Sequence, residues 1–193
     1  MPAPVAAEPP ARERALGALT GLALGDALGM PTQSMSPARI RRCYGTITGL
    51  RDAVAEQPIA PSVPAGSVTD DTEQALILAG LLIDGGGRID PHQLADALLR
   101  WEDDMRARGS LDLLGPSTKL ALERVRAGAD PHCTGRQGTT NGAAMRVTPV
   151  GIAFSLSADG DALARAVQAS CLVTHDTRQG FEAAGLLAAA VST

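Results

Sequence analysis

Aromatic residues are almost absent from this chain, since two phenylalanines, one tyrosine and one tryptophan make up only 2% of its 193 residues. Hydrophobic residues nevertheless reach 45%, so any core must be built from alanine, leucine, valine and isoleucine. Alanine and leucine are strong helix formers, and 193 residues suffice for one domain with a buried core. The composition therefore predicts an all-α fold and argues against a β-sandwich or barrel.

Cysteine is also scarce, with Cys43, Cys133 and Cys171 widely spaced and no Cys-x-x-Cys pair. An odd number at this spacing argues against a disulfide framework or a zinc site built from cysteines, and it favours a reducing, cytoplasmic location. An excess of positive charge is missing too, because the net charge is −4. Without a basic stripe, neither nucleic acid nor an anionic membrane is expected as a partner.

A membrane-spanning run is lacking as well. Residues 15–30 are nearly continuous in apolar side chains, but Asp26 and several glycines interrupt them, and the run is too short to span a bilayer. Glu8 and Glu13 stand where a signal peptide would carry its basic leader. We therefore predict a buried helix of a soluble protein.

The Pro- and Ala-rich residues 1–11 are predicted to be a disordered tail, ahead of one domain over residues 12–193. Glycine recurs at every fourth position within the first expected helix, which predicts that another backbone or a ligand comes close to that face. The positions are Gly17, Gly21, Gly25 and Gly29. Helices are expected over residues 12–28, 36–43, 70–83, 91–108, 116–127, 143–155, 159–171 and 178–191, with a long loop over most of 29–66.

Residues 67–73 (SVTDDTE) directly precede a strongly apolar helix. They can be an ordinary helix start, in which Thr69 or Asp70 caps the helix and the acids favour its dipole. However, a helix that is apolar on all sides is expected to be buried. Placing Asp70 and Asp71 at its start would then require a cation or a protonated carboxyl group. Mg²⁺ or Mn²⁺ suits carboxylate and hydroxyl oxygens, although this segment supplies at most three ligands.

Two further segments carry polar groups suited to ligand binding. Residues 138–146 (GTTNGAAMR) form a Gly- and Thr-rich loop that enters a helix, a pattern typical of an anion cradle but also of ordinary turns. His175 follows Thr174 near the end of another expected helix. A lone histidine is more often structural than catalytic, so neither segment is decisive alone.

In combination, these segments resemble the ADP-ribosylglycohydrolase family. The resemblance rests on four segments in order: residues 25–31 (GDALGMP), 69–72 (TDDT), 140–146 (TNGAAMR) and 174–175 (TH). The sequence is most similar to a bacterial subgroup whose members often occur beside a ribokinase-type sugar kinase. A nucleoside-like small molecule and an ADP-ribosylated protein are therefore both expected as substrate classes, and the oligomeric state is left open.

The resemblance implies a compact all-α fold with a binuclear Mg²⁺ centre that hydrolyses N-glycosidic bonds. Metal ligands from this chain would be Thr69, Asp70 and Asp71, with Asp26 behind them. The phosphate and ribose pocket would be lined by Gly138, Thr139, Thr140, Asn141 and Gly142, and His175 would contact the substrate.

Two departures from the family pattern bear on activity. Gln33 stands where many relatives carry a glutamate, and an amide cannot act as a general base, so the catalytic acid–base residue stays unassigned. The second metal-binding segment of the family, Asp-x-Asp-Thr, does not occur. We therefore expect this chain to be the N-terminal portion of such a domain. The alternatives are a catalytically inactive protein that binds ADP-ribose or a nucleotide, and a truncated gene product.

Overall fold

The computed structural model describes residues 10–108 and 114–192, and these ranges contain helices and no β-strand. The predicted all-α fold is confirmed. The helices are α1 (Ala11–Gly29), η1 (Met30–Thr32), α2 (Pro37–Tyr44), α3 (Asp70–Asp84), α4 (Pro91–Ala107), α5 (Pro116–Arg126), α6 (Gly142–Arg146), α7 (Thr148–Ala153), α8 (Gly160–His175) and α9 (Arg178–Val191). Of the predicted disordered tail, residues 1–9 lie outside the described residues, and Ala11 already begins α1.

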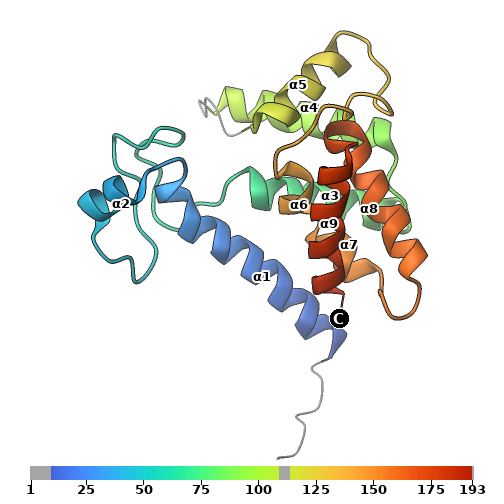
Figure 1. The fold of residues 1–193 in the computed structure, drawn as a ribbon, viewed down its shortest axis with the longest axis horizontal. Helices are drawn as coiled ribbons and strands as arrows, with labels where there is room; N and C mark the ends of the chain where they lie inside the picture. Colours follow the sequence, from blue (N-terminus) through green and yellow to red (C-terminus); the bar gives the residue numbers. More distant parts are fainter. Residues whose placement is uncertain (1–9, 109–113, 193) are drawn as a thin grey trace, which may run out of the picture.

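The main core is aliphatic and is gathered around α3, which runs through the middle of the helical body (Figure 1). Helix α3 packs against α1, α4, α6 and α7, while α9 packs against α6, α7 and α8. Four leucines from α3, α4 and α5 are fully buried in this core: Leu78, Leu94, Leu98 and Leu122. Leucine and alanine side chains thus fill the core in place of aromatic ones, as the composition predicts.

A small separate lobe follows α1 and contains η1, α2 and the long connection to α3 (Figure 1). Met30, Ala53 and Ala60 form its core. Polar contacts fix the loop, since Gln57 is 2% exposed and its Nε2 donates to the backbone oxygens of Met30 and Gln33 at 3.3 and 3.1 Å. The Tyr44 hydroxyl donates to Pro31 O at 3.0 Å. Buried polar groups of this kind, each with a partner, give one conformation to a loop that has little apolar surface.

Two predicted helices are wrong in their extent. Residues 143–155 were expected as a single helix, but α6 and α7 are two short helices that meet at Val147. Pro149 explains the break, because it has no N–H to donate to the carbonyl of Met145 and its ring would collide with that carbonyl. The helix predicted to end at residue 171 continues to His175 as α8.

The first helix is less buried than predicted. Only Ala27 of α1 is buried, and the side chain of Leu16 is 63% exposed. A Cβ atom added at any of the four regularly spaced glycines would meet no atom of the described residues within 4 Å, so no other backbone comes close there. Gly25 and Gly29 instead line a hollow, which leaves the predicted approach of a ligand open. Helix α3 is buried on one side only, since Ile83 is 78% exposed. Exposed apolar side chains on these two helices also include Leu24 and Leu76.

Two observations bear on the disulfide framework and the membrane-spanning helix that the sequence argues against. Cys43, Cys133 and Cys171 are free thiols. Within residues 10–108 and 114–192, the helices all fall short of the length and hydropathy that crossing a membrane requires.

Helix α7 contacts α9 through Gly151, and this contact can be tested. A Cβ atom at Gly151 would lie 2.5 Å from the backbone oxygen of Ala188, so Gly151→Ala should lower the free energy of unfolding by about 1–3 kcal/mol. Gly185→Ala in α9 is the matched control, because a Cβ there has open space and alanine favours the helix by up to about 1 kcal/mol. Urea unfolding measures both, and equal midpoints for the two variants would contradict the packing described.

Candidate functional site

The carboxylate of Asp26 links the end of α1 to the start of α3. Its Oδ1 accepts from the Thr69 hydroxyl at 2.7 Å, and its Oδ2 accepts from the Thr69 N–H at 2.7 Å and the Thr72 hydroxyl at 2.6 Å. The Thr72 N–H adds a longer bond of 3.3 Å to Oδ2. With both oxygens occupied in this way, Asp26 positions Thr69 and Thr72, and it caps α3 in place of a side chain from α3 itself.

The hydroxyl of Thr69 is oriented by this contact. Its single hydrogen points to Asp26 Oδ1 at 2.7 Å, so its lone pairs face elsewhere. Asp71 Oδ2 is a second, more distant acceptor for the same hydroxyl at 3.4 Å, and the one hydrogen cannot serve it while it is directed at the closer Asp26. Oxygen ligands at 2.0–2.1 Å from one octahedral Mg²⁺ lie about 2.9 Å apart. The two oxygens therefore fit a hard cation after a small contraction.

Asp70 adds a second carboxyl group in a drier environment. It is 5% exposed, and burial together with the charges of Asp71 and Asp26 raises its pKa to about 7. Burial and the charge of Asp26 also raise the pKa of Asp71. A divalent cation such as Mg²⁺ or Mn²⁺ stabilises a group of oxygen ligands whose negative charges repel one another. The residues present thus fit the predicted metal.

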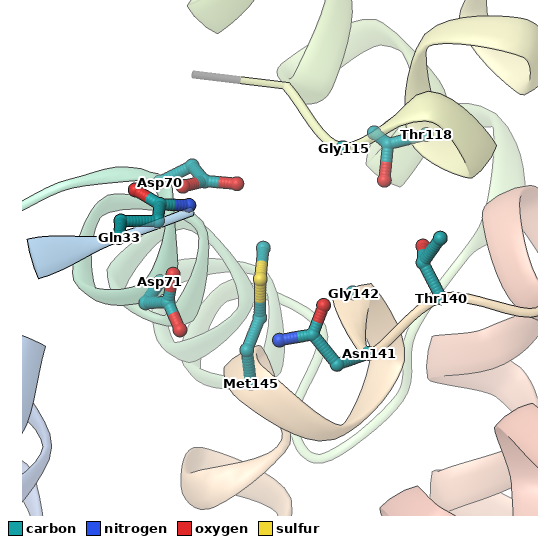
Figure 2. A pocket seen from close by; sticks show the side chains of 9 residues that line it. All are labelled: Gln33, Asp70, Asp71, Gly115, Thr118, Thr140, Asn141, Gly142 and Met145. Atoms are coloured by element: carbon teal, nitrogen blue, oxygen red, sulfur yellow. The ribbon is translucent and has the colours of Figure 1, made fainter. Parts of the chain in front are cut away.

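The three carboxylates do not form one compact cluster. Within the described residues, Asp26, Asp70 and Asp71 do not bring one oxygen each within 4.8 Å of one another. Asp70 and Asp71 leave adjacent positions of α3 in different directions, and both reach the same pocket (Figure 2). The negative charge is therefore spread along the wall of the pocket.

Two adjoining hollows lie against these carboxylates. The first, of about 60 Å³, has Asp70 and Asp71 on one wall and Thr140 and Asn141 on the other (Figure 2). The second, of about 290 Å³, adjoins Asp26 and Thr69. Both hollows share the lining residues Gln33, Asp71 and Asn141. The acidic segment and the Gly- and Thr-rich loop, far apart in the sequence, thus face the same space.

Only part of the predicted phosphate and ribose loop lines this space. Thr140, Asn141 and Gly142 do so, whereas Gly138 packs on α8, where a Cβ would lie 2.0 Å from the Thr174 oxygen. The backbone N–H groups of Thr139 and Thr140 donate to the Ser117 hydroxyl at 3.2 and 3.3 Å. These two amides hold the loop against α5, so they are not presented to an anion.

His175 lies behind Thr140 and is fully buried. His175 Nδ1 is hydrogen-bonded to Thr174 Oγ1 at 2.8 Å, and the same Thr174 oxygen accepts from Arg146 Nη2 at 2.5 Å. The other ring nitrogen, Nε2, is hydrogen-bonded to Thr140 Oγ1 at 2.9 Å. Burial and the nearby Arg146 charge lower the pKa of His175 to about 3, which keeps it neutral. In this arrangement His175 fixes the position of the Thr140 hydroxyl at the pocket.

Arg146 is the buried cation from which this chain of hydrogen bonds begins. Its guanidinium also donates to Gln74 Oε1 and Ser170 O, both at 3.1 Å, and thereby joins α3, α6 and α8. Burial lowers its pKa to about 10, while the charge of Asp70 acts in the opposite direction. Arg146 therefore stays charged at neutral pH and offsets part of the negative charge near α3.

Sequence reasoning missed the contribution of α5 to the site. Thr118 is 2% exposed and lines the first hollow together with Gly115, and Ser117 holds the loop. The sequence pattern that could have revealed this contribution is a pair of hydroxyl residues in the first turn of a helix that begins with proline. Met145, on α6, also lines the first hollow. Its position depended on the break between α6 and α7, which was not predicted.

Comparison with known proteins assigns the family. The sequence model of ADP-ribosylglycohydrolase matches residues 7–193. This chain belongs to the ADP-ribosylglycohydrolase family. It is 36% identical to the uncharacterised protein YegU of Escherichia coli over 93% of this chain and 53% of YegU. It is 32% identical to the ADP-ribosylarginine hydrolase Tri1 of Pseudomonas putida over 93% of this chain and 46% of Tri1.

A solved structure agrees with this assignment. A chain described as an ADP-ribosylglycohydrolase-related protein complex is 34% identical and superposes with a TM-score of 0.68, over 92% of this chain and 54% of that one. The family fold predicted from the sequence motifs is thus confirmed. This family member spans about half the length of the relatives it matches.

The raised pKa of Asp70 predicts a pH dependence of stability without divalent metal. Its folded value of about 7 exceeds the ordinary value near 3.8, so the folded state binds the extra proton and loses stability as pH rises from about 4 to about 7. Asp70→Asn should remove that part of the slope and be the more stable protein at pH 8. Thermal unfolding in a chelating buffer at several pH values measures the difference. If the melting temperatures of the two proteins changed with pH in parallel, the Asp70 carboxyl group would titrate normally.

Proposed function

We propose that this chain supplies the acidic metal-binding segment and the ribose-binding loop of a Mg²⁺-dependent hydrolase that cleaves N-glycosidic bonds of ADP-ribosylated or ribosylated substrates. The observation that carries the proposal is the pair of facing oxygens, Thr69 Oγ1 and Asp71 Oδ2, held 3.4 Å apart beside the buried Asp70. The name of the Pseudomonas putida relative, an ADP-ribosylarginine hydrolase, supports the reaction class.

The residues that would hold Mg²⁺, or Mn²⁺ in its place, are Thr69, Asp70 and Asp71. The bound metal would supply Lewis-acid stabilisation of charge at the ribose as the C1–N bond breaks. The donors from this chain are three, so the two-ion centre expected from the family needs ligands beyond these, and the complete activity is proposed for the whole domain.

The chain's own residues would position the ribose. Thr140 is fixed by its hydrogen bond to His175, and its hydroxyl lines the first hollow, where it can bond a ligand oxygen. Asn141 offers an amide that both accepts and donates, and it lines both hollows. Facing the acidic wall, these groups suit a sugar whose hydroxyls are held from two sides. A small ribosylated molecule and an ADP-ribosylated side chain share this sugar.

The metal ligands can be tested in the full-length gene product. Asp70→Ala and Asp71→Ala should each lower the Mg²⁺-dependent release of ADP-ribose from an ADP-ribosylated arginine peptide by about 100-fold or more. Asp84→Ala is the control, since Asp84 is an exposed acid at the opposite end of α3 and its loss should leave turnover unchanged. Retained activity in the Asp70 and Asp71 variants would overturn the proposed ligand set.

Gln33 favours a second candidate function, a protein that binds ADP-ribose without hydrolysing it. Its amide lines both hollows, at the position where the family resemblance implies a glutamate, and an amide cannot act as a general base. Calorimetric titration with ADP-ribose, run beside the turnover assay, separates the two functions. Saturable binding without turnover supports the binding protein, whereas turnover that survives Gln33→Ala shows that hydrolysis does not need this position.

A further inference from the structure

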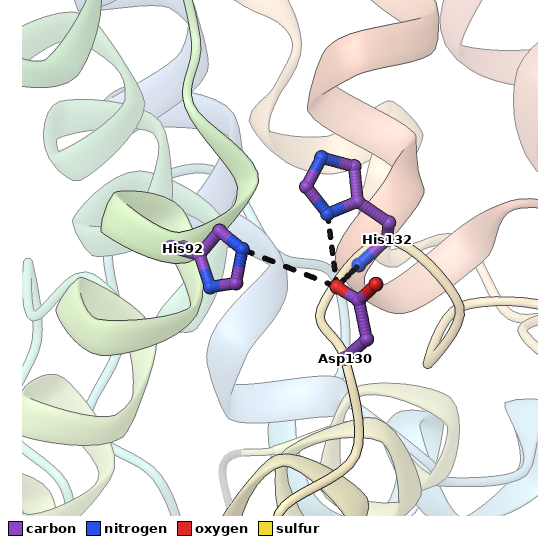
Figure 3. A group of neighbouring side chains, drawn as sticks. All are labelled: His92, Asp130 and His132. Carbon is purple, nitrogen blue, oxygen red and sulfur yellow. Dashed lines mark hydrogen bonds and ion pairs between the residues drawn. The ribbon is translucent and has the colours of Figure 1, made fainter.

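A second group of metal-binding side chains lies outside the acidic site. His92 stands in the first turn of α4, and Asp130 and His132 belong to the segment between α5 and α6 (Figure 3). None of the three lines the hollows at the acidic site. All three side chains are exposed, so a cation can reach them from solvent without any opening of the core.

Their ligand atoms converge on one carboxylate oxygen. His132 Nδ1 lies 2.9 Å and His92 Nε2 lies 4.0 Å from Asp130 Oδ1 (Figure 3). One ligand atom from each residue falls within 4.8 Å of the others. Ligands at about 2.0–2.1 Å from one tetrahedral ion lie about 3.3 Å apart. A small rotation of the exposed rings therefore brings all three onto one cation.

Backbone contacts hold the two sides of this group in place. The His92 N–H donates to its cap, Asp90 Oδ1, at 2.8 Å, which fixes the first turn of α4. On the other side, the His132 N–H donates to Asp130 Oδ1 at 3.0 Å, and the Thr134 hydroxyl anchors the segment to Val173 O at 2.6 Å. The chain thus offers the three ligands from two anchored elements.

The charge and the donor types favour a transition metal over Mg²⁺. Asp130 lies between the two histidines, and a second carboxylate, Asp90, lies beside His92, whose N–H it accepts at 2.8 Å. Two carboxylates are therefore available to balance a dication. Two imidazole nitrogens with one carboxylate oxygen suit zinc, nickel, cobalt or copper, whereas Mg²⁺ prefers oxygen ligands alone.

We propose that His92, Asp130 and His132 bind one transition-metal dication of the zinc class, with water completing its coordination. The bound cation would join the start of α4 to the segment that leads to Thr140 and Asn141. It would thereby brace the loop that lines the first hollow from outside.

Tag-free protein, stripped of metal, gives a direct test with zinc. Of the three histidines, His175 is fully buried, so only two imidazole signals should shift in a histidine-resolved NMR titration, saturating at one equivalent. His92→Ala and His132→Ala should each weaken zinc binding by about tenfold or more in calorimetry. Cys133→Ser is the matched control, since this exposed thiol in the same segment should not affect the affinity.

The alternative outcomes overturn the proposal. It fails if binding does not saturate by about 1 mM zinc, if both histidine variants keep the wild-type affinity, or if Cys133→Ser abolishes binding. Asp70→Asn should keep full zinc affinity at this site, and Mg²⁺ should leave the histidine signals unshifted. Those two controls separate this site from the acidic one, so either proposal can fail without the other.

Discussion

The hydrogen bonds of Asp26 are the constraint on which the acidic site depends. One carboxylate accepts from two residues more than forty positions away, and this places the end of α1 and the lobe that follows it beside the start of α3. The same contact decides where the Thr69 hydrogen points, and so leaves its lone pairs directed at Asp71. A neutral side chain at position 26 would lose both the link and the orientation.

A second polar system balances the first from inside the core. The acidic groups at the start of α3 disfavour one another, while Arg146 is a buried cation whose hydrogen bonds join α3, α6 and α8. Burial, together with the nearby Arg146 charge, lowers the pKa of His175 and keeps that ring neutral. The position of Thr140 in the pocket is therefore set by a chain of contacts that begins at a buried guanidinium. The network is not complete, since Gln74 Nε2 and Arg146 Nε are buried without a hydrogen-bond partner among the described residues. It therefore specifies the arrangement of the three helices more than it adds stability.

The sequence predicted most helices and the acidic segment, because those signals are local. Asp90 and Pro91 mark the start of α4, and the run after Asp71 marks α3, through capping and composition alone. The burial of α1 was mispredicted, since apolar composition does not determine which faces find a partner. The roles of Ser117, Gln57 and Arg146 depend on partners distant in the sequence, and no local pattern encodes those contacts. His175 was noticed as a residue, but its place behind Thr140 required the packing of α8 against the loop.

The four regularly spaced glycines of α1 have a consequence for natural sequence variation in this helix. No described atom would obstruct a methyl group at Gly17, Gly21, Gly25 or Gly29, and alanine favours a helix by about 1 kcal/mol at each position. Gly25 and Gly29 differ from Gly17 and Gly21, because they also line the second hollow beside Asp26, where a methyl group would narrow the space left for a ligand. Packing within the described residues therefore explains none of the four glycines, whereas the hollow can explain two. Natural variants should accept alanine more readily at positions 17 and 21 than at positions 25 and 29, so that sequence variation along one helix face would report where a ligand comes close.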